Sequence, residues 1–313
     1  MIRVALDAMG GDLGPRIAFE SALQLLSSST DVEIHLYYHH SFVSSCASHP
    51  RLKLIPCTDY VAADEAIDRT LFRRKQTSLY QAIASLSMNH ADVVVTLGNT
   101  GVMVALARHL LGLIKPKLYP ALIRELRSNP LRCLVDLGAN IHCPATMLHG
   151  FACLGGAYLE SFGLDKARVG LLNVGVESSK GSSVIRQADA LLEAGAWPEY
   201  AGYAEGYEIF KGDKNIIVCD GVVGNAVLKA SEGLLAVIMG ELASPVSQQK
   251  IESLFQSERR HGACLVGVRG NLVKGHGGSD VAAMVGAITY GIDIARVKLS
   301  EQVHARLLQG DIQ

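Results

Sequence analysis

Apolar residues recur along the chain with two different spacings. Short runs rich in Val, Ile and Leu are typical of buried strands, and longer stretches with apolar residues three or four positions apart are typical of helices. The predicted strands are 2–6, 32–38, 52–56, 92–97, 131–136, 168–174 and 216–220, with a strand pair at 263–268 and 271–273. The predicted helices are 15–26, 79–88, 102–113, 145–162, 182–194, 223–239 and 280–294. Because strands and helices alternate almost throughout, the pattern predicts an α/β layered fold with a largely parallel sheet.

No linker interrupts this alternation. We therefore expect a single domain over residues 1–313, with a polar helical insertion near 241–261. The stretch 143–159 has no formal charge, but it is shorter than the roughly 20 apolar residues that cross a bilayer, so we expect a buried helix there. The chain enters a strand directly and reaches Asp7 early, which is not the pattern of a signal peptide.

Six loops built from Gly, Asn and Asp follow the predicted strands. They are 6–12, 97–101, 135–140, 173–181, 220–225 and 269–278. In an open parallel sheet, ligands bind outside the carboxyl ends of the strands. Glycine lets backbone N–H groups approach a ligand closely, and a helix N-terminus favours an anion. We therefore expect these loops to converge on one pocket for a phosphate-like group, and the chain to be an enzyme.

The loops carry several kinds of polar side chain. Carboxylates follow three predicted strands, at Asp7, Asp136 and Asp220. We interpret them as acceptors that hold the loops, with coordination of a divalent ion as the alternative. Neutral amides that can donate to an oxyanion are Asn99, Asn140, Asn225 and Asn271. Point charges that can neutralise an anion are Lys180 and Lys274, and His276 lies between glycines, where a packing role is small.

Composition excludes several classes of function. With 49% apolar residues, 19% charged residues and a net charge of −1, the chain has material for a core and no basic field for nucleic acid. The seven cysteines are scattered without a C-x-x-C pair, which favours reduced thiols in a cytosolic compartment, with Cys143 as the candidate if one were a nucleophile. Dinucleotide, P-loop, zinc-ligand and serine-nucleophile motifs are missing, so we expect no metal and no cofactor.

The same loops carry a family resemblance. Residues 6–15, 98–101, 135–140, 219–225 and 262–277 resemble the bacterial phosphate acyltransferases of the PlsX type, in order from about residue 3 to 295. The resemblance implies a three-layer α/β/α sandwich similar to phosphotransacetylases and isocitrate or isopropylmalate dehydrogenases. It also implies transfer of a fatty acyl group from acyl-carrier protein to inorganic phosphate, giving acyl phosphate for phospholipid synthesis. A cytoplasmic homodimer with loose peripheral contact at the inner face of the plasma membrane, and a downstream membrane acyltransferase, are implied as well.

Our main hypothesis for the reaction is direct attack of a phosphate oxygen on the thioester carbonyl. Lys180 and Asn225 would stabilise the oxyanion, and His276 would orient phosphate or accept its proton. Residues expected to bind phosphate or substrate are Asp7, Gly10, Gly11, Asp12, Asn99, Thr100, Gly101, Asp136, Asn140, Asp220 and Gly224.

The chain also departs from the family pattern. In 173–181, two of the three acidic residues of the family block are replaced, and the region before residue 262 is shorter and more polar than usual. Positions 64–65 and 77–78 differ as well. Two other functions stay open: a Mg²⁺-dependent enzyme of the isocitrate dehydrogenase type, with Asp136 and Asp220 as ligands, and a non-catalytic module that binds acyl groups or a carrier protein.

Overall fold

The computed structural model describes residues 1–42, 48–128, 131–242, 244, 246 and 261–309. The chain forms two compact units. Unit 1 comprises Met1–Ile114 and Arg259–Glu301, and unit 2 comprises Lys115–Glu258 and Gln302–Gln313. That residues 1–313 form one domain stays a prediction, and most of the insertion predicted near 241–261 lies outside the described residues.

Unit 1 is built on six strands. In chain order they are β1 (Ile2–Asp7), β2 (Val32–His39), β3 (Leu52–Cys57), β4 (Val93–Thr96), β10 (Ala263–Val266) and β11 (Leu272–Lys274). They lie side by side in the order β3-β2-β1-β4-β11-β10. All neighbouring pairs are parallel except the pair of β10 with β11. The carboxyl ends of β1, β4 and β11 are in register, since Asp7 pairs with Thr96 and Thr96 pairs with Lys274.

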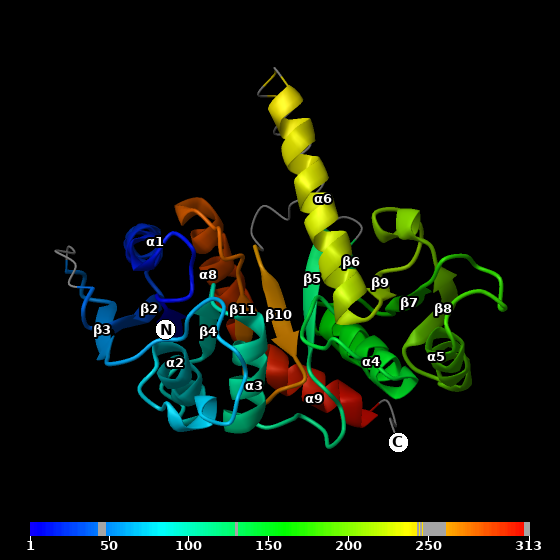
Figure 1. The fold of residues 1–313 in the computed structure, drawn as a ribbon, viewed down its shortest axis with the longest axis horizontal. Coiled ribbons are helices and arrows are strands. Elements are labelled where there is room, and N and C mark those ends of the chain that lie inside the picture. The colour runs from blue at the N-terminus through cyan, green and yellow to red at the C-terminus, as the bar shows by residue number, and fades with distance from the viewer. Residues whose placement is uncertain (43–47, 129–130, 243, 245, 247–260, 310–313) are drawn as a thin grey trace. The chain divides into compact units, whose positions relative to one another are not determined.

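Helices cover both faces of this sheet. They are α1 (Pro15–Ser28), α2 (Ser78–Ser87), α3 (Thr100–Leu110) and α8 (Val281–Arg296), with a short 3-10 turn η1 (Leu71–Arg73). Helices α1 and α8 pack together on one face, and α2 and α3 pack together on the other (Figure 1). The layers α, β and α follow from the sequence pattern, because the strands are buried on both faces and each helix buries one apolar side.

Unit 2 has a second set of strands. They are β5 (Ala121–Ser128), β6 (Leu131–Val135), β7 (Arg168–Leu172), β8 (Glu199–Ala204) and β9 (Ile216–Val218), in the order β5-β6-β9-β7-β8. Strand β5 is antiparallel to β6, and the other pairs are parallel. The helical elements are α4 (Ala145–Ser161), α5 (Ser183–Ala194), η2 (Gly206–Ile209) and α6 (Gly221–Glu241). Helix α9 (Leu299–Gln309) includes the point where the chain passes from unit 1 to unit 2.

The predicted strands and helices are all present, with boundaries shifted by a few residues, so the α/β class with a largely parallel sheet is confirmed. The stretch predicted as a buried helix is α4, which is buried along most of its length. Among the described strands and α-helices, β5, β8 and α9 were not predicted, and neither were the short 3-10 turns η1 and η2. Strand β5 was missed because charged residues interrupt its apolar run, although one of them, Glu125, is buried and accepts a hydrogen bond from Tyr158 at 2.8 Å.

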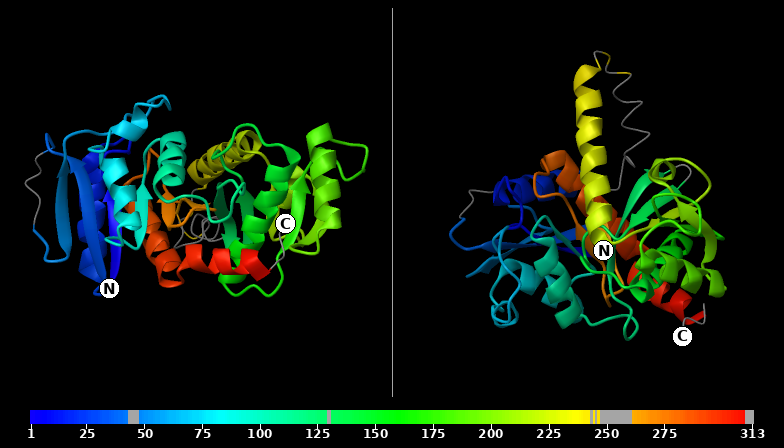
Figure 2. Two further views of the ribbon diagram at one scale, coloured as in Figure 1. Left: turned by 90° about the horizontal axis from the view of Figure 1, so that it is seen from below. Right: turned by 45° about the vertical axis from the view of Figure 1, so that its right-hand side comes forward.

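Helix α6 differs from the other helices in how little of it is buried. Only Gly221 and Gly224, in its first turn, are buried. Beyond that turn several of its apolar side chains are exposed, with Leu234 63% and Val237 64% exposed. The helix extends away from the sheet of unit 2 (Figure 2). Among the described helices it is the one that is long and apolar enough to cross a membrane, judged by length and composition.

Candidate active site

Three of the predicted loops meet in unit 1, at the carboxyl ends of β1, β4 and β11. We call residues 7–14, 97–101 and 274–279 the first loop cluster. Their backbones are in direct contact: Asp12 N donates to the Gly277 carbonyl at 2.9 Å, and Gly275 N donates to the Thr96 carbonyl at 2.9 Å. A side chain is excluded where the first two loops touch, because a Cβ on Gly10 would lie 2.2 Å from Gly98 N. Within unit 1, therefore, three of the six loops meet, whereas a single pocket shared by all six stays a prediction.

The side chain of Asp7 holds segments of this cluster together. Its carboxylate is buried and accepts hydrogen bonds from Ser78 Oγ at 2.7 Å, Thr96 Oγ1 at 2.8 Å and Met9 N at 3.2 Å. These partners come from α2, β4 and the loop after β1, so one side chain ties three segments together. Burial raises the pKa of Asp7, and the hydrogen bonds oppose that rise. The interpretation of Asp7 as a loop-holding acceptor agrees with these contacts.

Asn99 also binds its own chain. Its Oδ1 caps α3 by accepting from Val102 N at 3.1 Å, and its Nδ2 donates to the carbonyls of Ala63 at 3.0 Å and Glu65 at 3.1 Å. The side chain therefore clamps a preceding segment onto the start of α3. Thr100 and Gly101 are the first residues of that helix, so their backbone N–H groups have no acceptor within the helix and lie at the cluster.

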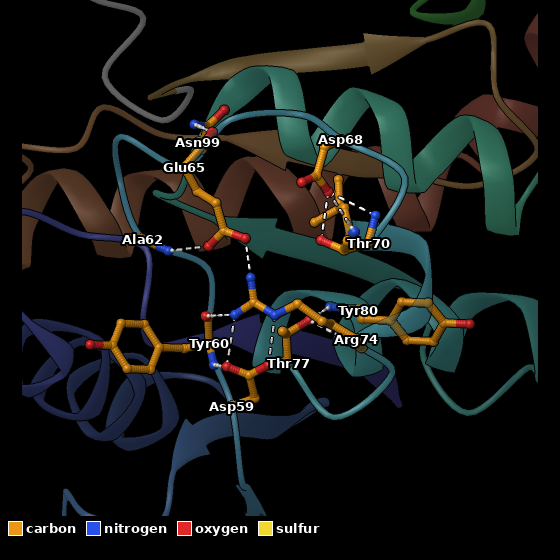
Figure 3. A network of polar contacts seen from close by, with 11 residues as sticks. Asp59, Tyr60, Ala62, Glu65, Asp68, Thr70, Arg74, Thr77, Tyr80 and Asn99 are labelled. Carbon is orange, nitrogen blue, oxygen red and sulfur yellow. Dashed lines mark hydrogen bonds and ion pairs between the residues drawn. The ribbon is translucent and has the colours of Figure 1, made fainter.

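The clamped segment, residues 59–77, is organised by one guanidinium (Figure 3). Arg74 donates to both oxygens of Asp59 at 2.8 Å, to the Tyr60 carbonyl at 2.7 Å, and to the Glu65 carboxylate. A Cβ on Gly101 would lie 2.7 Å from Ile67 Cδ1, so this segment packs against the first turn of α3. Sequence reasoning missed Arg74 and Ser78, since neither stands in a glycine loop and both act on partners distant in sequence.

The third loop of the cluster contains Lys274 and His276. The ammonium of Lys274 donates to the Leu97 carbonyl at 3.1 Å and to the Gly275 carbonyl. Burial lowers the pKa of Lys274 to about 8, against the attraction of Asp12 and Asp7. His276 is exposed, and its Nδ1 accepts from Gly278 N at 3.0 Å.

Asn271 does not belong with these residues. It precedes β11, at the opposite end of that strand, where it donates to the Asp92 carbonyl at 3.1 Å and accepts from Ser300 N at 3.1 Å. The expectation that Asn271 shares the site is therefore wrong, because the loop 269–278 contains a strand that separates its two ends.

The other three loops lie in unit 2, at the carboxyl ends of the parallel strands β6, β9 and β7. We call residues 136–140, 173–181 and 219–225 the second loop cluster. Val135 and Leu171 both pair with Val218, so these strands end level with one another. Gly221 N donates to the Asn140 carbonyl at 3.0 Å, and a Cβ on Gly224 would lie 1.9 Å from the Asp136 carbonyl oxygen.

Asp136 holds the first loop of this cluster. It is fully buried and accepts from the amides of Leu122, Leu137, Ala139 and Asn140 at 2.7–3.2 Å. The side chain of Asn140 donates to the same carboxylate at 3.0 Å and to the Pro120 carbonyl at 2.8 Å. Burial raises the pKa of Asp136, and the N–H donors oppose the rise. These hydrogen bonds make Asp136 an acceptor that holds the loop, because N–H donors surround the carboxylate oxygens with which a metal ion would have to coordinate.

Asp220 caps α6 by accepting from the amides of Val222 at 3.0 Å and Val223 at 2.9 Å. Among the described residues, no group of three or more His, Cys, Asp or Glu side chains is arranged to hold a metal ion. Cys143 lies beside Asn140, with Sγ 3.6 Å from its carbonyl oxygen. Burial raises the pKa of Cys143 to about 11, which keeps the thiol protonated at neutral pH and disfavours a nucleophilic role.

Lys180 and Asn225 come from two loops of the second cluster. Lys180 is exposed, and its loop is shaped by Asn173, whose Nδ2 donates to the carbonyls of Gly175 at 3.1 Å and Lys180 at 3.4 Å. The side chain of Asn225 lies beside Gly138, where an added Cβ would be 3.8 Å from Asn225 Cβ. Both predicted catalytic residues of unit 2 therefore stand at the same sheet edge as the loop that Asp136 holds.

A family described as "Fatty acid synthesis protein" matches residues 2–302 of the chain. The chain belongs to this family, the PlsX family. Among its relatives, the protein named phosphate acyltransferase of Pseudomonas syringae pv. tomato is 35% identical over 97% of this chain and 96% of its own length. The phosphate acyltransferase of Delftia acidovorans is 36% identical over 98% of this chain and 94% of its own.

Solved structures of other enzymes share the fold. A branched-chain phosphotransacylase from Enterococcus faecalis has a TM-score of 0.62 at 16% identity, over 94% of this chain and 99% of its own. A 4-hydroxythreonine-4-phosphate dehydrogenase from Klebsiella pneumoniae has a TM-score of 0.58 at 13% identity, over 94% of this chain and 100% of its own. The expected likeness to phosphotransacetylase and dehydrogenase folds is therefore confirmed for this PlsX family member.

Proposed function

We propose that this protein transfers a fatty acyl group from the thioester of acyl-carrier protein to inorganic phosphate, giving acyl phosphate for phospholipid synthesis. Membership of a family whose relatives are named phosphate acyltransferase supports transfer to phosphate. The observation that carries the proposal is the gathering of glycine loops and helix N-termini at the carboxyl ends of parallel strands. Such an edge favours an anion, since helix N-termini attract negative charge and glycines let a ligand approach the backbone closely.

We assign phosphate to the first loop cluster. Gly10, Gly11 and the first turn of α3 present backbone there, and Lys274 is the half-buried cation of the same cluster. The carboxylates of Asp7 and Asp12 do not favour an anion. Asp7 accordingly acts through the loops that it holds, and not by contact with phosphate.

The chemistry that we propose is direct attack of a phosphate oxygen on the thioester carbonyl. A thiol leaving group with a pKa of about 8.5 needs little help from a general acid. Positioning supplies much of the rate, since well-oriented reactants reach effective molarities of about 10⁵–10⁸ M. An oxyanion donor adds roughly 10²–10³ in rate, and Lys180 and Asn225 are our candidates for that role. His276 orients phosphate or accepts its proton, which is supported by its exposed ring and by an Nε2 that has no hydrogen bond to the residues that the structure describes.

The Lys180→Met variant tests this assignment. Lys180 is exposed, so the variant is expected to fold normally while losing most of its production of acyl phosphate. Lys166→Met is the matched control, because Lys166 is also exposed but precedes β7, at the opposite end of the strand. Purified protein is mixed with a long-chain acyl-carrier thioester, with and without phosphate, and free thiol is followed. Thiol release that does not need phosphate would refute acyl transfer to phosphate, and full activity of Lys180→Met would refute the role of Lys180.

We further propose that α6 carries the contacts with a second subunit and with the inner face of the plasma membrane. Its outward apolar side chains, Leu234 and Val237 among them, support this. The double variant Leu234→Lys, Val237→Lys is expected to lose co-sedimentation with anionic lipid vesicles and to shift toward monomer in analytical ultracentrifugation. Leu308→Lys, at a residue of α9 that is 64% exposed, serves as the control. Unchanged sedimentation in both assays would contradict the proposal.

A further inference from the structure

Lys274 occupies a place in the first loop cluster that is unlike that of any ordinary surface lysine. It is the last residue of β11, beside Thr96 of β4, and Thr96 is in turn beside Asp7 of β1. Its ammonium is turned back into the cluster, where it donates to the carbonyls of Leu97 and Gly275. Leu97 directly precedes the loop 98–101, and Gly275 directly precedes His276. One side chain thus joins two of the three loops.

The positive charge of Lys274 has two carboxylates near it, those of Asp7 and Asp12. Asp7, at the end of β1, and Asp12, in the loop that follows, both lie close enough to attract it. His276 is the titratable group of its own loop, and the residue of α2 that faces Asp7 is the uncharged Ser78. An anion brought to the glycine loops therefore meets two carboxylates, and Lys274 supplies the opposing charge.

We propose that Lys274 is the cation on which anion binding by the first loop cluster depends, because it fastens the loops 97–101 and 274–279 together and offsets Asp7 and Asp12. This inference rests on the proposed function only in taking phosphate as the natural anion. The chemistry that it requires is a tetrahedral oxyanion held by backbone amides next to one ammonium group.

The proposal predicts how binding changes with pH. Since its pKa lies near 8, the ammonium loses its proton as the pH rises through that value. Anion binding is expected to be strong below that pH and to weaken as the pH rises through it. If the neutral amine does not support binding, affinity falls by about tenfold between pH 7 and pH 9 for a group with this pKa.

Sulfate is the probe that isolates this titration. It is a tetrahedral dianion throughout the range, whereas phosphate changes its own charge near neutrality. The dissociation constant of sulfate is measured by calorimetry from pH 7.2 to 9.5 on the full chain, in the wild type and in the variants Lys274→Arg and Lys274→Met.

The wild type is expected to lose affinity for sulfate by about thirtyfold across the window, since a group with a pKa near 8 is mostly protonated at its lower end and almost wholly neutral at its upper end. Lys274→Arg keeps its charge, so its affinity stays constant. Lys274→Met binds weakly at every pH, at the level of the wild type at pH 9.5. An equal loss of affinity in wild type and Lys274→Arg would overturn the proposal, as would tight binding by Lys274→Met. If Lys274→Met does not fold, as judged by circular dichroism, the comparison of wild type with Lys274→Arg decides alone.

This experiment is independent of turnover because no acyl donor is present. A pH-dependent sulfate affinity that disappears in Lys274→Arg, in a protein that makes no acyl phosphate, would support Lys274 and reject the proposed function. Normal acyl phosphate production with a sulfate affinity indifferent to Lys274 would do the reverse.

Discussion

Gly10 and Gly98 are in backbone contact: a Cβ on Gly10 would lie 2.2 Å from the amide nitrogen and 2.4 Å from the Cα of Gly98. The loop after β1 and the loop after β4 can approach one another this closely because neither residue has a side chain. The contact brings two sets of backbone amides to one place, and the proposed anion site depends on it.

Gly10→Ala should separate these two loops. The nearest atoms are backbone and cannot turn aside, so we expect a loss of roughly 1–3 kcal/mol in the free energy of unfolding and a large rise in KM for phosphate. Urea denaturation and steady-state kinetics measure the two effects. Gly206→Ala is the matched control, because no atom lies within 4 Å of an added Cβ there. Wild-type kinetics in Gly10→Ala would show that the contact is not needed.

Asp7→Asn should change how stability depends on pH. An unfolded Asp loses its proton near pH 3.9, whereas burial raises the pKa of folded Asp7. The contribution of Asp7 to stability is therefore complete below the unfolded value and is lost as the pH rises through the folded value. Asparagine does not titrate. The free energy of unfolding of the variant, measured by urea denaturation, should therefore rise relative to that of the wild type between pH 4 and pH 7. Asp68→Asn should show the opposite trend, since the hydroxyl of Thr70 lowers the pKa of Asp68. A difference between Asp7→Asn and wild type that does not vary with pH would contradict this account.

Asp136→Asn should destabilise the protein more than Asp220→Asn. The carboxylate of Asp136 is buried and surrounded by N–H donors, and an amide would turn its own N–H groups toward them. We expect a loss of roughly 2–4 kcal/mol in the free energy of unfolding. Asp220 caps α6 with one oxygen, and Asn is an equally good cap, so the change there should be within about 0.5 kcal/mol. Chemical denaturation compares the two, and equal losses would refute the distinction.

Arg74→Met should release the segment 59–77. The variant removes the hydrogen bonds to Asp59, Tyr60 and Glu65, so the segment keeps fewer contacts with the rest of unit 1, those of Asn99 among them. We expect faster limited proteolysis within 59–77 and a higher KM for substrate. Arg73→Met is the control, since Arg73 is the exposed neighbour in the same turn. Equal cleavage rates in the two variants would show that Arg74 does not hold the segment.

The sequence was sufficient for most of the framework, because hydrophobic periodicity reports burial and burial defines these strands and helices. It also located the loops, since parallel strands place their carboxyl ends at one edge whatever their spacing in the chain. It did not show β8, whose Gly202 adopts a positive φ of 79° and whose apolar run is short.

The partners of the loop residues could not be read from the sequence in the same way. Ser78 lies 71 residues from Asp7, and nothing near Ser78 marks it as a donor to a buried carboxylate. The side-chain amide of Asn99 resembled a free donor for an oxyanion. In the structure it donates to the carbonyls of Ala63 and Glu65 and accepts from the first turn of α3. Local patterns predict where a polar residue stands, and only tertiary contacts decide what it binds.

Unit 1 is assembled from two stretches of chain, 1–114 and 259–301, with β11 lying between β4 and β10. During synthesis on the ribosome, the edge of β4 that pairs with β11 accordingly has no partner strand until more than a hundred further residues have been added. Lys274 and His276 emerge after the other two loops of this cluster, so a polypeptide that ends before residue 274 would carry the opening glycine motif without the cation that we propose for anion binding there.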